Sequence, residues 1–121
     1  MTKVLVCGGR DFFEREFVFR QLDKYHAQYK FTQVIHGAAP GVDSLVHEWA
    51  ALRGVERRPF PAQWKTFKNA AGHIRNEQML VEGQPDMVVA FPGGAGTSNM
   101  IKQTLNAGLP LITVSFFPDK E

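Results

Sequence analysis

Residues 87–97 read Met-Val-Val-Ala-Phe-Pro-Gly-Gly-Ala-Gly-Thr, an apolar run that passes directly into a glycine-rich turn. A short apolar run bounded by glycine and proline is typical of a strand covered on both faces, as in a parallel sheet. Similar runs occupy residues 3–7, 32–35 and 111–114. Residues 55–60 form a more polar run, which we interpret as an edge strand. The sequence therefore predicts about five strands.

Helical patterns lie between these runs. Apolar side chains recur at spacings of three and four in residues 14–29, 42–53 and 97–107, which predicts amphipathic helices. Residues 70–82 are less periodic, but we expect a helix there too. Regular alternation of strands and helices is typical of an α/β domain with a mainly parallel sheet.

Composition limits the classes of protein to consider. The chain has 121 residues, of which 44% are hydrophobic and 21% charged, and its net charge is +2. This length suits one domain with its own core, and the small net charge gives no bulk signal of a nucleic-acid protein. The single cysteine, Cys7, excludes an internal disulfide and a zinc site built from several cysteines. We expect no metal and no other cofactor.

Two further features bear on location. No apolar run approaches the length of roughly 18 residues that a membrane span needs. Residues 1–4, Met-Thr-Lys-Val, lack the basic region and long apolar stretch of a signal peptide. We therefore expect a cytoplasmic protein with no membrane partner.

The strongest site signal is the loop that holds Gly93, Gly94, Gly96 and Thr97. Ligands of open parallel sheets sit beyond the carboxyl ends of the strands, where this loop lies. Its glycines allow close backbone approach, and we expect Thr97 and Ser98 to cap the next helix. Free amide hydrogens at a helix start bind anions, most naturally phosphate. An ordinary tight strand–helix turn is the alternative.

The loop after the first strand contains Gly8, Gly9, Arg10 and Asp11. The two glycines let the backbone pass close to a ligand, and Arg10 offers paired donors to a phosphate or carboxylate. The loop matches neither G-x-G-x-x-G nor a P-loop, so we expect no standard dinucleotide or ATPase site. Alternatively, Arg10 and Asp11 form a local ion pair where the next helix starts.

The loop after the second strand supplies four more candidates, His36, Gly37, Gly41 and Asp43. Asp43 either caps the helix that begins there or binds a ribose hydroxyl. His36 is either a hydrogen-bonded structural histidine or a group that contacts a ligand.

Three candidates come from the following stretch. Trp64 either stacks on a base or is a core or interface tryptophan. It lies in residues 61–70, the longest irregular piece, and irregular stretches of that length are more often functional than idle. Arg75 and Asn76 fall in the expected fourth helix, where Arg75 either points back into the crevice or is a solvated charge.

These segments resemble a known group of proteins. Residues 75–79 (Arg-Asn-Glu-Gln-Met) and 92–97 (Pro-Gly-Gly-Ala-Gly-Thr) look like the R-N-x-x-M and P-G-G-x-G-T signatures of the SLOG superfamily. That superfamily contains the LOG (lonely guy) phosphoribohydrolases and the DNA-processing Smf/DprA proteins. Residues 36–45 resemble its G-x-A-x-G-x-D loop. Residues 8–12 and 60–64 look closest to the small bacterial and phage YspA-like, YpsA-related SLOG proteins.

The resemblance covers nearly the whole chain. It implies that residues 1–121 form a single SLOG-like nucleotide-binding domain with a Rossmann-like three-layer fold, and that this domain forms homo-oligomers such as a dimer. In LOG enzymes, the arginine of the first motif and a glutamate three residues after the threonine cleave the N-glycosidic bond of nucleoside 5′-monophosphates. Arg75 matches that arginine and is the one candidate catalytic residue, but Met100 occupies the glutamate position. Methionine neither stabilises an oxocarbenium-like centre nor transfers protons.

We therefore predict a domain that binds or senses a nucleotide or nucleotide-derived molecule, without efficient LOG-type catalysis. The first alternative is a nucleoside 5′-monophosphate phosphoribohydrolase that uses another acid, Asp43 or Glu77. The second alternative is single-stranded nucleic-acid binding. It rests on five basic residues within nineteen positions: Arg57, Arg58, Lys65, Lys68 and Arg75.

Overall fold

A computed structural model describes residues 1–118 of the chain. The strands are β1 (Thr2–Cys7), β2 (Phe31–His36), β3 (Glu56–Pro59), β4 (Met87–Ala90) and β5 (Leu111–Thr113). The helices are α1 (Arg15–Tyr29), α2 (Val42–Arg53), α3 (Trp64–Phe67), the 3₁₀ turn η1 (Lys68–Ala70), α4 (Ala71–Val81) and α5 (Ala95–Asn106). None of the helices in this described part is long and apolar enough to cross a membrane.

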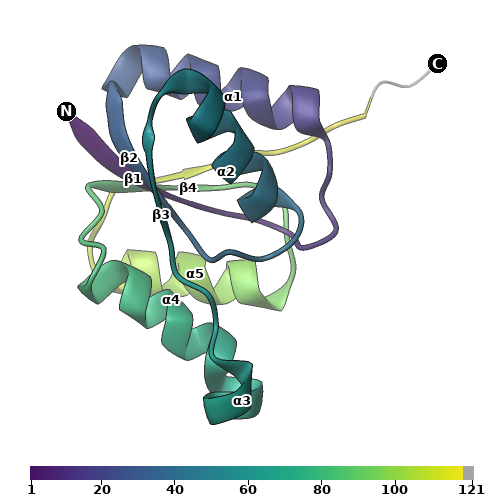
Figure 1. Cartoon of the computed structure of the whole chain (residues 1–121), viewed down its shortest axis with the longest axis vertical. Coiled ribbons are helices and arrows are strands. Elements are labelled where there is room, and N and C mark those ends of the chain that lie inside the picture. Colours follow the sequence, from purple (N-terminus) through teal and green to yellow (C-terminus); the bar gives the residue numbers. More distant parts are fainter. Residues whose placement is uncertain (119–121) are drawn as a thin grey trace.

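The five strands form one parallel sheet in the order β3-β2-β1-β4-β5. Helices α1 and α2 lie on one face, and α4 and α5 lie on the other (Figure 1). Alternate side chains of β1 serve the two faces: Val4 and Val6 join the core beneath α1 and α2, whereas Leu5 and Cys7 join the core beneath α4 and α5. The predicted Rossmann-like three-layer α/β fold is confirmed.

Strand β3 lies at one edge of the sheet, and within residues 1–118 it pairs only with β2. Its Glu56 and Arg57 side chains are exposed. Charged residues on an edge strand hinder pairing with another chain. The interpretation of this polar run as an edge strand is confirmed.

Two local predictions were wrong. Helix α5 begins at Ala95, because the Gly94 carbonyl already accepts from the Ser98 amide (N···O 3.0 Å), so Thr97 and Ser98 lie in its first turn and do not cap it. The stretch 61–70 is not irregular throughout, since it contains α3 and η1.

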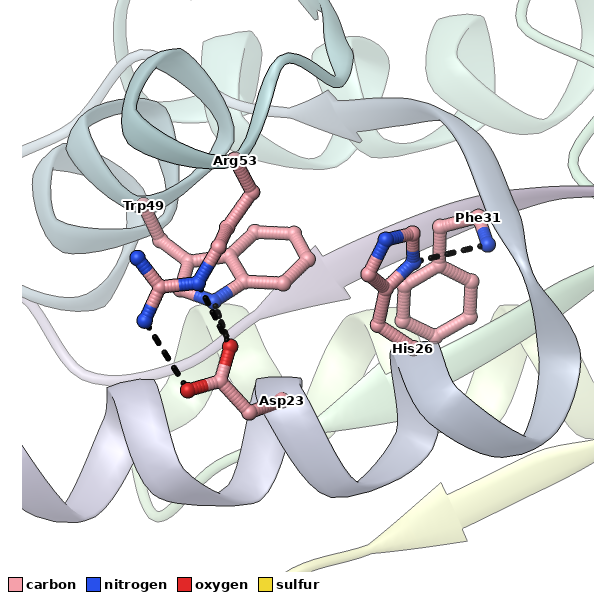
Figure 2. A network of polar contacts seen from close by, with 5 residues as sticks. All are labelled: Asp23, His26, Phe31, Trp49 and Arg53. Atoms are coloured by element: carbon pink, nitrogen blue, oxygen red, sulfur yellow. Dashed lines mark hydrogen bonds and ion pairs between the residues drawn. The ribbon is translucent and has the colours of Figure 1, made fainter.

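A polar network fastens α1 to α2 (Figure 2). The Asp23 carboxylate on α1 accepts from Nε1 of the buried Trp49 (2.8 Å) and from both Nε and Nη2 of Arg53 (2.8 and 2.9 Å) on α2. The Arg53 hydrogen bonds are the main reason that the pKa of Asp23 is lowered. At the end of α1, His26 Nδ1 accepts from the Phe31 amide (3.0 Å) and ties the helix to β2.

Candidate functional site

A cavity of about 540 Å³ opens beyond the carboxyl ends of β1, β2 and β4. The strand order reverses at β1, which is the usual ligand position in open α/β sheets. Twelve of the fifteen residues predicted for the site line this cavity: Gly8, Gly9, Arg10, Asp11, Gly37, Asp43, Trp64, Arg75, Asn76, Gly94, Gly96 and Thr97.

Gly41 and Gly93 do not line the cavity but allow its loops to meet. Gly41 has φ +77°, and a β-carbon there would collide with the Gly9 carbonyl. A β-carbon on Gly93 would collide with the Thr97 hydroxyl and lie 2.7 Å from the Gly9 amide nitrogen. The Gly9 amide in turn donates to the Pro92 carbonyl (2.8 Å), so the first and last loops are joined through their backbones.

His36 is buried beside the cavity and is not part of its lining. Its Nδ1 accepts from the Ala38 amide (3.0 Å), and its Nε2 lies 2.9 Å from Nδ1 of His47. Burial lowers the pKa of His36 to about 4. The ring is therefore neutral at pH 7, and its contacts with Ala38 and His47 match the structural alternative for this residue.

Arg75 and Asp43 approach each other across Gly37. From α4, Arg75 Nη1 donates to the Gly37 carbonyl, so the side chain points into the cavity. Helix α2 begins after Gly41, so Asp43 lies in the first turn and is not the cap; its Oδ2 accepts from the Ala39 amide (3.2 Å). Burial raises the pKa of Asp43 to about 6, and the positive charge of Arg75 opposes that rise.

Arg10 and Trp64 lie at the rim of the cavity. The Arg10 guanidinium carbon is 5.8 Å from the centroid of the Trp64 ring, within the range of a cation–π contact. Trp64 is 48% exposed, so it is not a core tryptophan. Among the described residues Arg10 and Asp11 form no ion pair, since the charged pairs there are Arg15–Glu48 and Arg53–Asp23.

The first turn of α5 faces the same cavity through Gly94, Ala95, Gly96 and Thr97. A β-carbon on Gly94 or Gly96 would meet no atom within 4 Å, so the space beside these two residues is open. The amide groups of a first helical turn have no partners within the helix and carry the positive end of its dipole.

Sequence reasoning missed several cavity-lining residues. The lining includes Asn69, Gly72 and Met79 together with Asn76. These residues follow one another at the three- and four-residue spacing of a helix face, and this spacing could have predicted that they line the cavity with Asn76. Cys7 also lines it, at the carboxyl end of β1, and burial raises the pKa of its thiol to about 12.

The two carboxylates considered as substitutes for the missing glutamate lie in different places. Asp43 lines the cavity, whereas Glu77 is exposed and belongs to a separate hollow on the outer side of α4. Met100 is fully buried in the core beneath α4 and α5 and is not part of the cavity lining.

The predicted basic cluster is divided among several environments. Arg58 donates to the Glu82 carbonyl (Nη1···O 3.2 Å), and Arg57 Nη1 lies 3.1 Å from His47 Nε2. Arg75 belongs to the cavity, while Lys65 and Lys68 are exposed. Three of the five cations are thus engaged with other parts of the protein.

A model of the YspA, cpYpsA-related SLOG family matches residues 2–67, which is more than half of the chain. The match includes the loops around residues 8–11 and 36–43 and ends before Arg75 and the 92–97 loop. No curated protein matches the chain. The resemblance to YspA-like SLOG proteins is confirmed, and the chain belongs to the YspA, cpYpsA-related SLOG family.

Proposed function

We propose that the protein binds a nucleotide or a nucleotide-derived molecule in the cavity at the ends of β1, β2 and β4, without efficient hydrolysis. The observation that carries this proposal is the combination of the open first turn of α5 with Arg75, Asp43 and an exposed indole around one cavity. Membership of the SLOG family also favours a nucleotide-related ligand.

A phosphate group fits the end of the cavity formed by Gly94, Gly96 and Thr97. The unpartnered amides and the helix dipole favour an anion there. Arg75 enters the same cavity from α4, and Arg10 stands at its rim, so each can add a charged hydrogen bond.

The remainder of a nucleotide has matching partners. Asp43 offers acceptor sites to ribose hydroxyls, because a carboxylate has about four lone-pair sites and the Ala39 amide uses one of them. Trp64 offers an aromatic face to the base, and Arg10 already lies against that ring. The cavity volume is within the range of roughly 300–1,000 Å³ found for small-ligand sites.

Isothermal titration with a panel of nucleotides, AMP and ADP-ribose among them, tests the proposal. The informative pair of variants is Gly94→Asp and Gly94→Ala, because a β-carbon at Gly94 meets no atom within 4 Å. We expect the alanine variant to bind within about threefold of the parent, while the aspartate places a negative charge where phosphate binds and abolishes binding. If no phosphate-bearing molecule binds the folded parent, or if both variants bind equally, the proposal is wrong.

The second candidate function is N-glycosidic hydrolysis of a nucleoside 5′-monophosphate. It is favoured by one observation, the buried Asp43 carboxylate in the cavity with a pKa raised to about 6, which suits a group that transfers protons near neutral pH. Water would add at C1′ and give one proton to the Asp43 carboxylate as the C1′–N bond breaks, and that proton would pass to the leaving ring nitrogen, so the products would be ribose 5-phosphate and the neutral free base.

Chromatographic detection of free base from AMP tests this second candidate. Activity must disappear in both Asp43→Asn and Arg75→Ala if these residues carry the reaction. A folded parent protein that releases no base from purine or pyrimidine monophosphates excludes it.

A further inference from the structure

Asn76 is a buried amide whose hydrogen-bonding groups are all engaged by the protein. Its side chain is 4% exposed. Its Oδ1 accepts from Nε of Arg75 (3.1 Å), and its Nδ2 donates both to the Gly96 carbonyl (3.1 Å) and to Oδ1 of Asn99 (3.0 Å). Asn76 lines the cavity, but its two amide protons and one oxygen lone pair are already used.

These bonds join two parts of the proposed anion site. Arg75 comes from α4, whereas Gly96 lies in the first turn of α5. We propose that Asn76 is a positioning residue that holds the Arg75 guanidinium and the first turn of α5 in one fixed arrangement, so that both meet the same anion. This inference rests on the proposed function, since that function places the anion between these two groups.

The network continues behind Asn76. Oδ1 of Asn99 also accepts from Nε2 of Gln103 (2.8 Å), one turn further along α5. Asn99 thus presents an oxygen to Asn76 in a fixed orientation, which favours one rotamer of the Asn76 amide. That amide orientation in turn aims an oxygen, not an NH₂ group, at Arg75.

Aspartate is the most informative replacement for Asn76 because it has nearly the same shape. It keeps an oxygen acceptor for Arg75 Nε, but it loses both donors and turns a negative oxygen toward the Gly96 and Asn99 oxygens. The first turn of α5 should then move away from Arg75. Small displacements of a binding group can cost up to about 100-fold in function.

The experiment is an NMR titration of the full chain with inorganic phosphate, following the backbone amides of residues 94–97. We expect Asn76→Asp to weaken phosphate binding at least tenfold. Asn69→Asp is the matched control, because Asn69 is an exposed amide on the cavity lining and the change adds the same charge without touching the network. The control should weaken binding clearly less than Asn76→Asp does.

A double-mutant cycle separates positioning from a general loss of structure. Arg75→Lys should weaken phosphate binding in the parent but have little further effect in the Asn76→Asp background, because the arginine there no longer shares the anion with α5. Fully additive losses would overturn the inference. If Asn76→Asp does not fold, Asn99→Ala takes its place: it removes one bond of Asn76, and we expect an intermediate loss of phosphate affinity.

The rate at which the Arg75 Nε proton exchanges with water, measured by ¹⁵N NMR, tests the inference without any ligand. The hydrogen bond to Asn76 should slow its exchange with water in the parent and in Asn76→Asp, and exchange should be fast in Asn76→Ala.

If the parent does not bind phosphate, the proposed function has failed for this probe, and the exchange rate of the Nε proton alone tests the positioning role. Equal exchange rates in the parent and Asn76→Ala would overturn the inference, as would equal phosphate affinities of Asn76→Asp and Asn69→Asp.

Discussion

Arg75 and Asp43 converge on the same glycine from two different helices. A β-carbon on Gly37 would collide with Nη1 of Arg75 and lie 3.0 Å from Oδ2 of Asp43. Arg75 also donates to the Gly37 carbonyl. The absence of a side chain at Gly37 is therefore what allows a cation and a buried carboxylate to occupy one wall of the cavity.

We predict that Gly37→Ala displaces Arg75 and weakens nucleotide binding at least tenfold. The added methyl group should lower the free energy of unfolding by less than the roughly 1–3 kcal/mol of core overpacking, because the atoms it meets first are the far end of the flexible Arg75 side chain. Isothermal titration with AMP and urea denaturation measure the two effects. Gly72→Ala is the control, because a methyl group there would lie 3.8 Å from Trp64, at ordinary contact distance. Equal affinities of the two variants would contradict the prediction.

Much of the fold was predictable because every strand and most helices have a local signature, whereas the short α3 and η1 have none. The apolar runs before Gly8, Gly37 and Gly93 predicted three strands whose ends meet, since parallel strands place their carboxyl ends on one edge. The sequence shows an apolar residue, Met100, where the resemblance to LOG enzymes implies a glutamate. Only the structure shows that Met100 is a core residue.

Other features depend on contacts that a sequence does not contain. The role of His36 depends on His47, eleven residues away, whose Nδ1 lies 2.9 Å from the His36 Nε2. The engagement of Asn76 by Gly96 and Asn99 depends on how α4 packs against α5. Residue type and spacing do not reveal whether both groups of a buried amide already have protein partners.

We predict that Trp64→Ala weakens AMP binding but leaves the affinity for inorganic phosphate unchanged. Stacking of a base on an aromatic ring contributes about 1–3 kcal/mol, which corresponds to roughly five- to 150-fold in affinity. Phe67→Ala is the control, since Phe67 is an exposed aromatic residue of the same short helix that does not line the cavity. Titration of each variant with AMP and with phosphate measures the difference. Equal losses for both ligands would show that Trp64 supports the cavity and does not bind a base.

We predict that Asp43→Asn changes how stability depends on pH. Burial raises the pKa of Asp43 from 3.8 to about 6, so between these values the folded protein holds a proton that the unfolded chain releases. This carboxyl therefore lowers the free energy of unfolding as pH rises from about 4 to 6, by at most about 1.4 kcal/mol per pH unit. Relative to the parent, the asparagine variant should gain stability over that range.

Urea denaturation at pH 4, 5, 6 and 7 checks this prediction. The lowered pKa of His36 acts in the opposite direction over nearly the same range, but it is common to both proteins. The difference between parent and variant therefore isolates Asp43. A difference that stays constant with pH would contradict a raised pKa.

We predict that Asp23→Ala destabilises the protein more than Glu48→Ala does, although each removes one ion pair with an arginine. Asp23 also accepts from Nε1 of the fully buried Trp49, which the substitution leaves without its acceptor. An unsatisfied buried donor costs about 1–3 kcal/mol, whereas an exposed ion pair contributes at most about 1 kcal/mol. Urea denaturation of both variants measures the difference, and equal losses would mean that water replaces Asp23 at the indole.

The resemblance to LOG enzymes places Met100 at the position of their glutamate. We expect that Met100→Glu does not create hydrolase activity. The Met100 side chain is fully buried among residues such as Leu5 and Val88, so a glutamate there would be an unpaired charge in the core. Such a charge costs about 3–5 kcal/mol at neutral pH, or leaves the carboxyl protonated with a strongly raised pKa.

Met100→Gln is the control that keeps the length and polarity without the charge. The glutamate variant should be less stable than the glutamine variant at pH 7, and the gap should narrow at pH 4.5 as the carboxyl gains a proton. Release of free base from AMP by a stable Met100→Glu protein would show instead that this position reaches the cavity.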